Sequence, residues 1–201
     1  MSDQFAIRRD AYIKYLYSLE NALRSDIPRR VSEARRVLAR LRNSFVEGRQ
    51  YQAYEIVFQQ DPPEDGSEVD TWLLVGGLFA LHPLSWMGGG GPRSLGASLG
   101  RLQRKLESPA VERRLSLLLA KDKQSLPYQL RQTVRLLSMH DLPVHYGQLL
   151  DDLIVLLGRN HRGDIASKVR LKWAREYYMP ISAPALEGTE QPSIDSPETT
   201  Q

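Results

Sequence analysis

The sequence has no cysteine and no long apolar run, and each absence excludes a class of protein. Without cysteine there can be no disulfide framework, thiolate metal site or cysteine nucleophile, and we expect a cytoplasmic protein. The most apolar stretch, residues 72–86, contains a proline and is too short to span a bilayer. The N-terminal residues are amphipathic and do not resemble a signal peptide. We therefore expect no membrane contact.

Strand patterns are also missing, because no segment alternates β-branched and polar residues. Apolar residues instead recur at steps of three and four, in a background of Leu, Arg, Ala, Gln and Glu that favours helix. The sequence predicts an all-α fold of about nine helices in two small bundles packed together. The expected helices cover roughly residues 4–24, 31–45, 49–60, 70–81, 94–106, 109–120, 127–138, 145–157 and 164–179.

Glycine and proline divide the chain. The run Gly88–Gly91 predicts a flexible connection over residues 84–93, between an N-terminal helical half (1–83) and a C-terminal helical half (94–179). Residues 180–201 are rich in Pro, Ser, Thr and Glu and predict a disordered acidic tail. Inside the fourth predicted helix, Gly76 and Gly77 would each cost about 1 kcal/mol on an exposed surface. We expect that another helix approaches closely there.

Groups suited to catalysis are few. His140, Asp141 and His145 come closest to a zinc site, but a proline separates them and they indicate a turn and a helix start. Asp151 and Asp152 are sequence neighbours, so on a helix they point about 100° apart and cannot share a proton. The four-glycine run lacks the Lys-Ser/Thr of a phosphate-binding loop. We expect no catalytic residue, metal, cofactor or small-molecule substrate.

Positive charge is concentrated in the second half of the chain. Residues 180–201 hold four carboxylates and no Lys or Arg, so residues 1–179 carry +7 where the whole chain carries +3. Three successive predicted helices between residues 93 and 135 each turn a basic face outward. Arginines beside an exposed aromatic ring suit single-stranded nucleic acid, whose phosphates pair with arginine while a base stacks on the ring. The candidate contacts are Arg101, Arg104, Arg113, Arg114, Tyr128, Arg131 and Arg135.

A second group of basic residues lies elsewhere. The last predicted helix places Lys168, Lys172 and Arg175 on one face, and the second predicted helix carries Arg40 and Arg42. All five are further candidate contacts, although an ordinary solvated face gives the same pattern. No helix places Asn, Gln and Arg to read base edges, so any binding should be independent of sequence.

One arginine of the last helix points the other way. Arg170 falls on the apolar side, and we expect it to pair with a buried carboxylate such as Asp152, the alternative being a subunit contact. The aromatic residues Trp173, Tyr177 and Tyr178 are expected in core and dimer packing rather than as stacking platforms.

Several helical segments in order resemble CasB, the small subunit of the type I-E Cascade complex of CRISPR immunity. The resemblance covers most of residues 70–178, and the N-terminal third fits more loosely around ARLRNSF (residues 39–45). The segments that carry it are SLGRL (98–102), SPAVERRLSLLLAKDK (108–123), YQLRQTVRLL (128–137), YGQLLDDLIVLL (146–157) and VRLKWAREYY (169–178).

The resemblance implies an all-helical, non-enzymatic protein. Two copies would sit in a ribonucleoprotein with a crRNA and the subunits CasA, CasC, CasD and CasE. Their basic surface would hold the displaced non-target DNA strand and stabilise the R-loop. The first alternative is a helical scaffold that docks on protein or crRNA and never contacts DNA. A second alternative, a helix-turn-helix regulator, lacks a base-reading helix.

Overall fold

The structure, a computed structural model, describes residues 2–86, 90–159 and 161–179, with side chains from residue 6 onward. Within these residues there are nine α-helices, and the strand-like pairing is limited to an isolated bridge between Ser85 and Val144. The all-α prediction is confirmed. The expected tail and part of the glycine run lie outside the described residues. The helices are α1 (Ser2–Leu23), α2 (Pro28–Arg42), α3 (Tyr51–Phe58), α4 (Gly66–Leu81), α5 (Leu95–Leu106), α6 (Pro109–Ala120), α7 (Leu126–Met139), α8 (Tyr146–Leu157) and α9 (Asp164–Tyr178), and a short 3-10 helix, η1 (Asn43–Phe45), follows α2.

Capping residues set the helix boundaries. Ser94 and Ser108 cap α5 and α6 by accepting hydrogen bonds from the backbone N–H groups of Ala97 and Ala110. The fourth helix begins four residues earlier than predicted, because the Asp65 carboxylate accepts a hydrogen bond from the Ser67 N–H at 2.9 Å. The sequence stretch before it, rich in Pro and Asp, indicated a loop, and the cap within that loop was missed.

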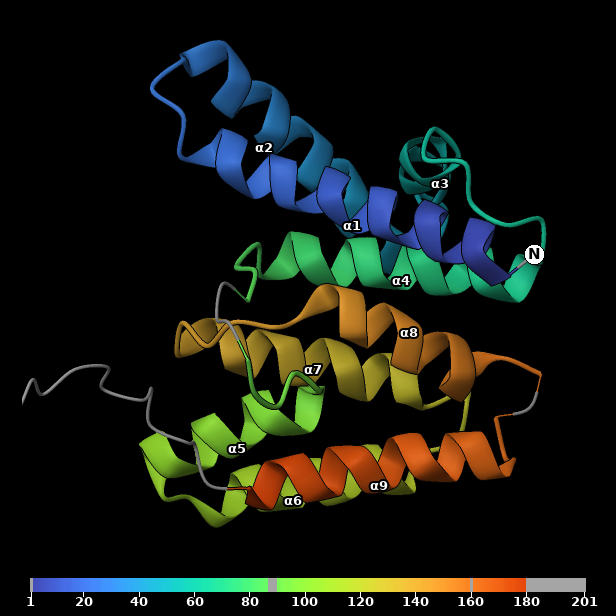
Figure 1. The fold of residues 1–201 in the computed structure, drawn as a ribbon. Coiled ribbons are helices and arrows are strands. Elements are labelled where there is room, and N and C mark those ends of the chain that lie inside the picture. The colour runs from blue at the N-terminus through green and yellow to red at the C-terminus, as the bar shows by residue number, and fades with distance from the viewer. Residues whose placement is uncertain (1, 87–89, 160, 180–201) are drawn as a thin grey trace, which may run out of the picture.

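The helices form two bundles, as predicted. Figure 1 shows α1, α2, α3 and α4 above, and α5 to α9 below. The most apolar helix, α4, lies at the boundary: it packs on α2 and α3 of its own bundle and on α7 and α8 of the other. Every residue from Thr71 to Ala80 is buried, so one hydrophobic core runs through both bundles. Within the described residues, no helix has both the length and the apolar character to cross a membrane.

The paired glycines of α4 allow close contact, as predicted. A Cβ on Gly76 would overlap the Tyr12 hydroxyl, and one on Gly77 would overlap Ser44 and Phe45. The ring of Tyr12 stacks on Trp72 with centroids 4.6 Å apart, and its hydroxyl donates to the Trp72 carbonyl. Side chains of α1 and η1 therefore pack directly against the backbone of α4.

A second pair of glycines joins α5 to α9, and the sequence did not point to it. A Cβ on Gly96 would overlap the carbonyl oxygen of Trp173, and one on Gly100 would overlap that of Tyr177. Gly96 and Gly100 are one turn apart, so both lie on the same face of α5. The backbones of α5 and α9 are therefore in direct contact along this face.

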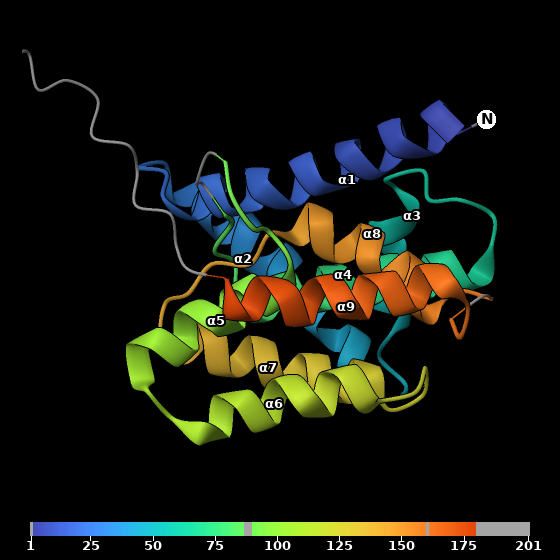
Figure 2. The same ribbon diagram turned by 60° about the horizontal axis from the view of Figure 1, so that its bottom comes forward.

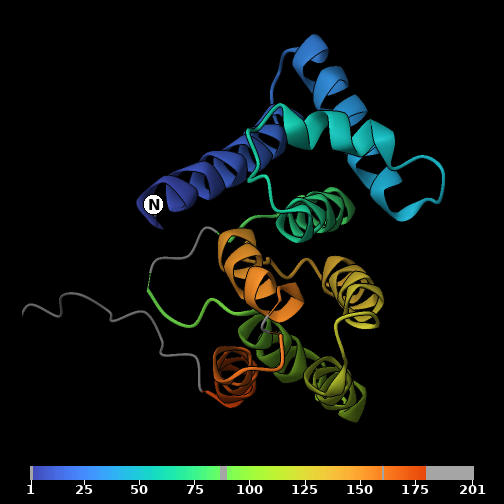
Figure 3. The same cartoon turned by 90° about the vertical axis from the view of Figure 1, so that its right-hand side faces the viewer.

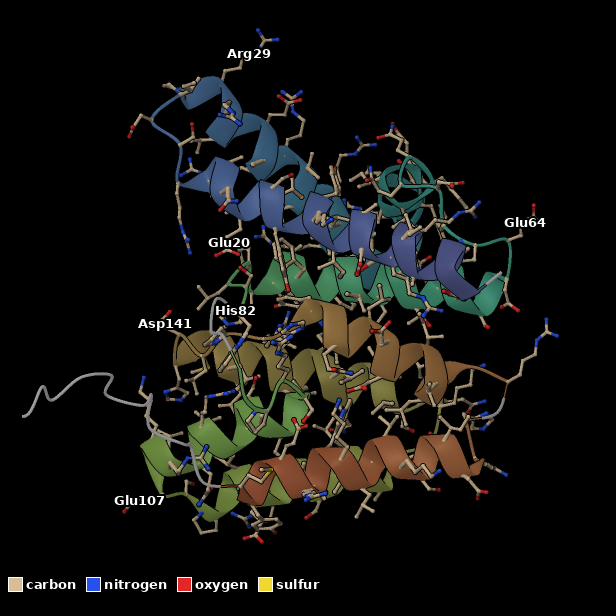
Figure 4. The ribbon with its side chains drawn as sticks, viewed as in Figure 1. Glu20, Arg29, Glu64, His82, Glu107 and Asp141 are labelled. Atoms are coloured by element: carbon tan, nitrogen blue, oxygen red, sulfur yellow. The ribbon has the colours of Figure 1, made fainter. Side chains whose placement is uncertain are left out.

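A buried carboxylate lies where the chain passes from one bundle to the other. Glu20 on α1 is buried, accepts a hydrogen bond from the Ser85 N–H at 2.9 Å and pairs with Arg24 at 2.7 Å. The buried His82 bonds the Leu142 carbonyl, and Figure 4 shows Glu20 and His82 at the same end of the molecule. Burial of His82 lowers the pKa of its imidazole, and this effect exceeds the opposing effects of the Leu142 carbonyl, Asp141 and Glu20.

Candidate nucleic-acid interface

The outer face of α7 carries an exposed aromatic ring among its predicted basic residues. Tyr128 is 62% exposed, and Arg135 is exposed two turns further along the same stripe. Arg131 lies between them and places its guanidinium over the ring of Phe45, 4.9 Å from the centroid. The helix contains no carboxylate, and neither arginine forms an ion pair within the described residues. No carboxylate of the described residues therefore neutralises the charge of either arginine.

Arg42 lies near this face although it belongs to the other bundle. Its Nε donates to the Ala80 carbonyl at 2.7 Å, one turn along α4 from Gly77, on which Phe45 packs. Arg42 and Phe45 thus contact the same stretch of α4, and α4 packs on α7. The α7 surface, as we call it, is made of Arg42, Lys123, Tyr128, Arg131 and Arg135.

The two arginines of α6 differ. Arg114 is half-buried and reaches Gln129 of α7 at 3.5 Å, which places it at the edge of α7 away from Arg131. Arg113 is exposed. Arg114 can therefore extend the α7 surface on the side of α6.

The arginines of α5 are used within the chain. Arg101 packs over the ring of Trp86 at 3.7 Å and donates to the Pro92 carbonyl at 3.2 Å. Burial, and then the neighbouring charge of Arg104, lower the pKa of Arg101 to about 10, so it remains charged at neutral pH. Arg104 donates to the carbonyl of Met179 at 3.3 Å. Arg101 therefore contacts two residues of the segment that connects the bundles, Trp86 and Pro92.

The remaining candidates lie apart from the α7 surface. Arg40 forms an ion pair with Glu55 of α3. Lys168, Lys172 and Arg175 lie on α9, and Figure 3 shows α9 and α7 on different sides of the C-terminal bundle. Lys172 is half-buried, and its charge acts on Asp152 and His145. The structure thus brings together only part of the predicted set.

The expected pairing of Arg170 with Asp152 is wrong. Asp152 is buried and accepts hydrogen bonds from Trp173 Nε1 at 2.6 Å and from Gln148 at 2.9 Å. Arg170 instead donates to the backbone carbonyl of His161 at 3.3 Å. The indole donor one turn further along α9 satisfies the carboxylate, and helical periodicity alone could not distinguish the two donors. Trp173 and Tyr177 are buried as predicted, whereas Tyr178 is exposed and donates to Glu112.

Replacing Asp152 with asparagine is expected to leave stability near neutral pH unchanged or raised. The asparagine oxygen can accept from Trp173 Nε1, and the Gln148 amide can turn over so that its oxygen accepts from the asparagine NH2. Burial raises the pKa of the Asp152 carboxyl, so the folded state binds its proton more tightly than the unfolded state does. This group therefore lowers stability as the pH rises from its unfolded pKa of about 3.9 through its folded pKa. Urea unfolding of both proteins across this pH range should show that the free energy of unfolding of Asp152→Asn rises relative to that of wild type as the pH rises. Asp152→Leu is the control: it orphans the Trp173 N–H and should cost about 1–3 kcal/mol. Equal stability of all three proteins would contradict this account.

Residues that the sequence offered for zinc binding or for acid–base chemistry have structural roles. His145 Nδ1 accepts the Gln148 N–H at 3.0 Å and caps α8. Asp151 lies 3.5 Å from Arg9 of α1. No cluster of His, Cys, Asp and Glu in the described parts of the chain could hold a metal ion.

The chain is similar to proteins of known family. The model of a family described as "CRISPR-associated protein Cse2" matches residues 22–178, more than half of the chain. The chain belongs to the Cse2 family. A Cse2 protein of Thermus thermophilus is 30% identical over 113 residues, which are 55% of this chain and 57% of that relative. This alignment thus spans less than two thirds of the relative's length.

Solved structures of Cse2 relatives share the fold. The crystal structure of M. ruber CasB is 28% identical and has a TM-score of 0.61, covering 85% of this chain and 92% of that one. A chain of a CRISPR RNA-guided surveillance complex has the same fold at 19% identity, with a TM-score of 0.61 and coverage of 86% and 92%. The resemblance to CasB that the helical segments suggested is confirmed.

Some residues of the interface could not be found from the sequence. Phe45, Lys123 and Trp86 contact the predicted arginines or lie beside them, yet they come from separate segments. Only the tertiary packing of η1 on α4 and α7 brings Phe45 beneath Arg131.

Proposed function

We propose that this Cse2-family protein is the non-enzymatic small subunit of a type I-E Cascade and that its α7 surface binds the displaced non-target DNA strand. Its partners would be a crRNA, CasA, CasC, CasD, CasE and a second copy of the chain. The observation that carries the proposal is the unpaired Arg131 and Arg135 beside the exposed Tyr128, on a helix without carboxylates. Family membership supports the assembly.

The physical role follows from the energetics of an R-loop. The RNA–DNA heteroduplex is about as stable as the DNA duplex it replaces, so a few contacts to the displaced strand shift the balance. Arginines give such contacts without reading sequence, because they bind phosphates. A strand along the α7 surface would pass Arg131 and Arg135 in succession, with Arg42 and Arg114 at its borders.

A scaffold that never contacts DNA is the second candidate. It is favoured by the internal use of Arg40, Arg101 and Arg104, which leaves them little freedom to bind phosphate. Exposed apolar residues on α9, Ile165 and Leu171, would also suit protein docking.

A salt titration of single-stranded DNA binding separates the two candidates. Each phosphate contact on a single strand contributes about −0.7 to the slope of log affinity against log salt concentration. We expect Arg131→Ala/Arg135→Ala to make the slope less steep by about 1.4, without loss of assembly. The measurement should use the full chain alone and assembled with its partner subunits.

Arg29→Ala/Arg30→Ala is the charge-matched control, since both residues are exposed at the start of α2, far from α7 (Figure 4). It should leave the slope almost unchanged. An unchanged slope for the α7 double variant together with failed assembly would favour the scaffold.

A further inference from the structure

A groove lies at one edge of the α7 surface, where the two bundles meet. It has a volume of about 490 Å³ and is lined by η1, α3 and α4 on one side and by Lys123, the start of α7 and Leu157 on the other. Figure 2 shows α7 and α6 from below, and Figure 3 shows α7 beneath the α4 layer. Pockets of roughly 300–1,000 Å³ hold small organic ligands, so the groove can accept a nucleotide.

Three aromatic rings line this groove: Phe45, Tyr54 and Tyr128. Tyr128 is exposed despite its size, and no aromatic ring of the described residues stacks on it. The Arg131 guanidinium lies over one face of the Phe45 ring, and this contact holds a flat cationic group and an aromatic ring together in the wall of the groove. Such walls hold unpaired bases, because every base offers a π-face for stacking.

The polar groups of the groove are of two kinds. Lys123 and Arg131 are cations, and Arg131 Nε is buried without a hydrogen-bond partner. Asp70 accepts the Tyr54 hydroxyl through Oδ1 at 2.9 Å, and no hydrogen bond within the described residues occupies its other oxygen. Cations favour a phosphate next to the ring system, and a carboxylate accepts from an exocyclic amino group of a base.

We propose that this groove is a nucleobase pocket, which takes one unstacked base of the strand held on the α7 surface and prefers bases with an exocyclic amino group. The proposal rests on the proposed function and deepens it, because it adds a stacking site to a track of phosphate contacts. Tyr128 stacks on the base, Arg131 and Lys123 hold the adjoining phosphate, and Asp70 accepts from the amino group. A track of phosphate contacts by itself would not distinguish a strand with bases from one without.

The test compares three single strands of equal length: oligo-dC, oligo-dT and a strand of abasic nucleotides. All carry the same phosphates, so a purely electrostatic track binds them equally. We expect wild-type protein to bind oligo-dC best and the abasic strand least. Tyr128→Ala should reduce binding of both base-bearing strands by roughly 5- to 150-fold, the range for loss of one stacking side chain, and leave the abasic strand unaffected. Asp70→Ala should remove the preference for oligo-dC over oligo-dT, and the affinity for both should stay higher than the affinity for the abasic strand.

Tyr51→Ala is the matched control, because Tyr51 is 66% exposed on α3 and does not line the groove. It should leave all three affinities unchanged. Equal, salt-sensitive binding of the three strands by wild type would retain the proposed function and overturn the pocket. Failure to bind any strand, alone and in the assembled complex, would overturn both. Weakened assembly of Tyr128→Ala with unchanged strand binding would identify the groove as a protein-docking site and overturn the pocket.

Discussion

Replacing Gly96 with valine is expected to destabilise the protein by about 3 kcal/mol or more. The added side chain would occupy the space of the Trp173 carbonyl oxygen. A backbone atom in the middle of α9 cannot move aside as a flexible side chain can, so the two helices must separate. Urea unfolding followed by circular dichroism measures the loss.

Gly66→Ala is the matched control for this substitution. Nothing lies within 4 Å of a Cβ at Gly66, the first residue of α4. Alanine there should be neutral or slightly stabilising, because it restricts the unfolded chain. If Gly96→Val unfolds at the same urea concentration as wild type, the close contact of α5 with α9 is not present in solution.

Replacing Trp173 with alanine is expected to cost about 3–5 kcal/mol. The indole is 1% exposed, so its removal leaves a cavity between α9 and α8. The change also takes away the N–H donor at 2.6 Å from Oδ2 of the buried Asp152 carboxylate, and this oxygen left without a donor adds to the loss. Thermal and urea unfolding measure both parts together.

Two further variants separate the cavity from the hydrogen bond. Trp173→Phe keeps most of the volume and removes the donor, so it should cost less than alanine yet more than the exposed control Leu171→Ala. Leu171 is 68% exposed on the same helix, and its truncation should change stability by less than about 0.5 kcal/mol. Equal losses of stability in Leu171→Ala and Trp173→Ala would show that the packing of the Trp173 indole does not hold α9 on the bundle.

The fold could be predicted from the sequence because helical signals are local. Ser-Pro at residues 108–109 and the Asp164 start gave helix boundaries within a residue or two of those observed. The capping aspartate of α4 was missed, since a cap inside a run of prolines and carboxylates looks like a loop. Gly96 and Gly100 were missed for another reason: their role depends on α9, which lies about seventy residues away in the sequence.

The candidate interface was harder to predict. The sequence shows which arginines lie on the polar face of a helix. It does not show which of them contact other residues of the same chain. Arg101 and Arg135 look alike in the sequence, yet one packs over Trp86 and the other is exposed. The Arg170 prediction failed in the same way, because the choice between two donors for Asp152 depends on side-chain geometry.

The contact of Arg131 with Phe45 joins residues from the two bundles, and so the α7 surface belongs to neither bundle alone. Any opening between the bundles would separate the guanidinium from its ring and move Arg42 away from Arg131. A strand that needs both arginines would bind only the closed arrangement and, by mass action, would favour it. The affinity for the strand and the stability of the contact between the bundles are then thermodynamically linked. A substitution that weakens the contact between the bundles also lowers the affinity for the strand.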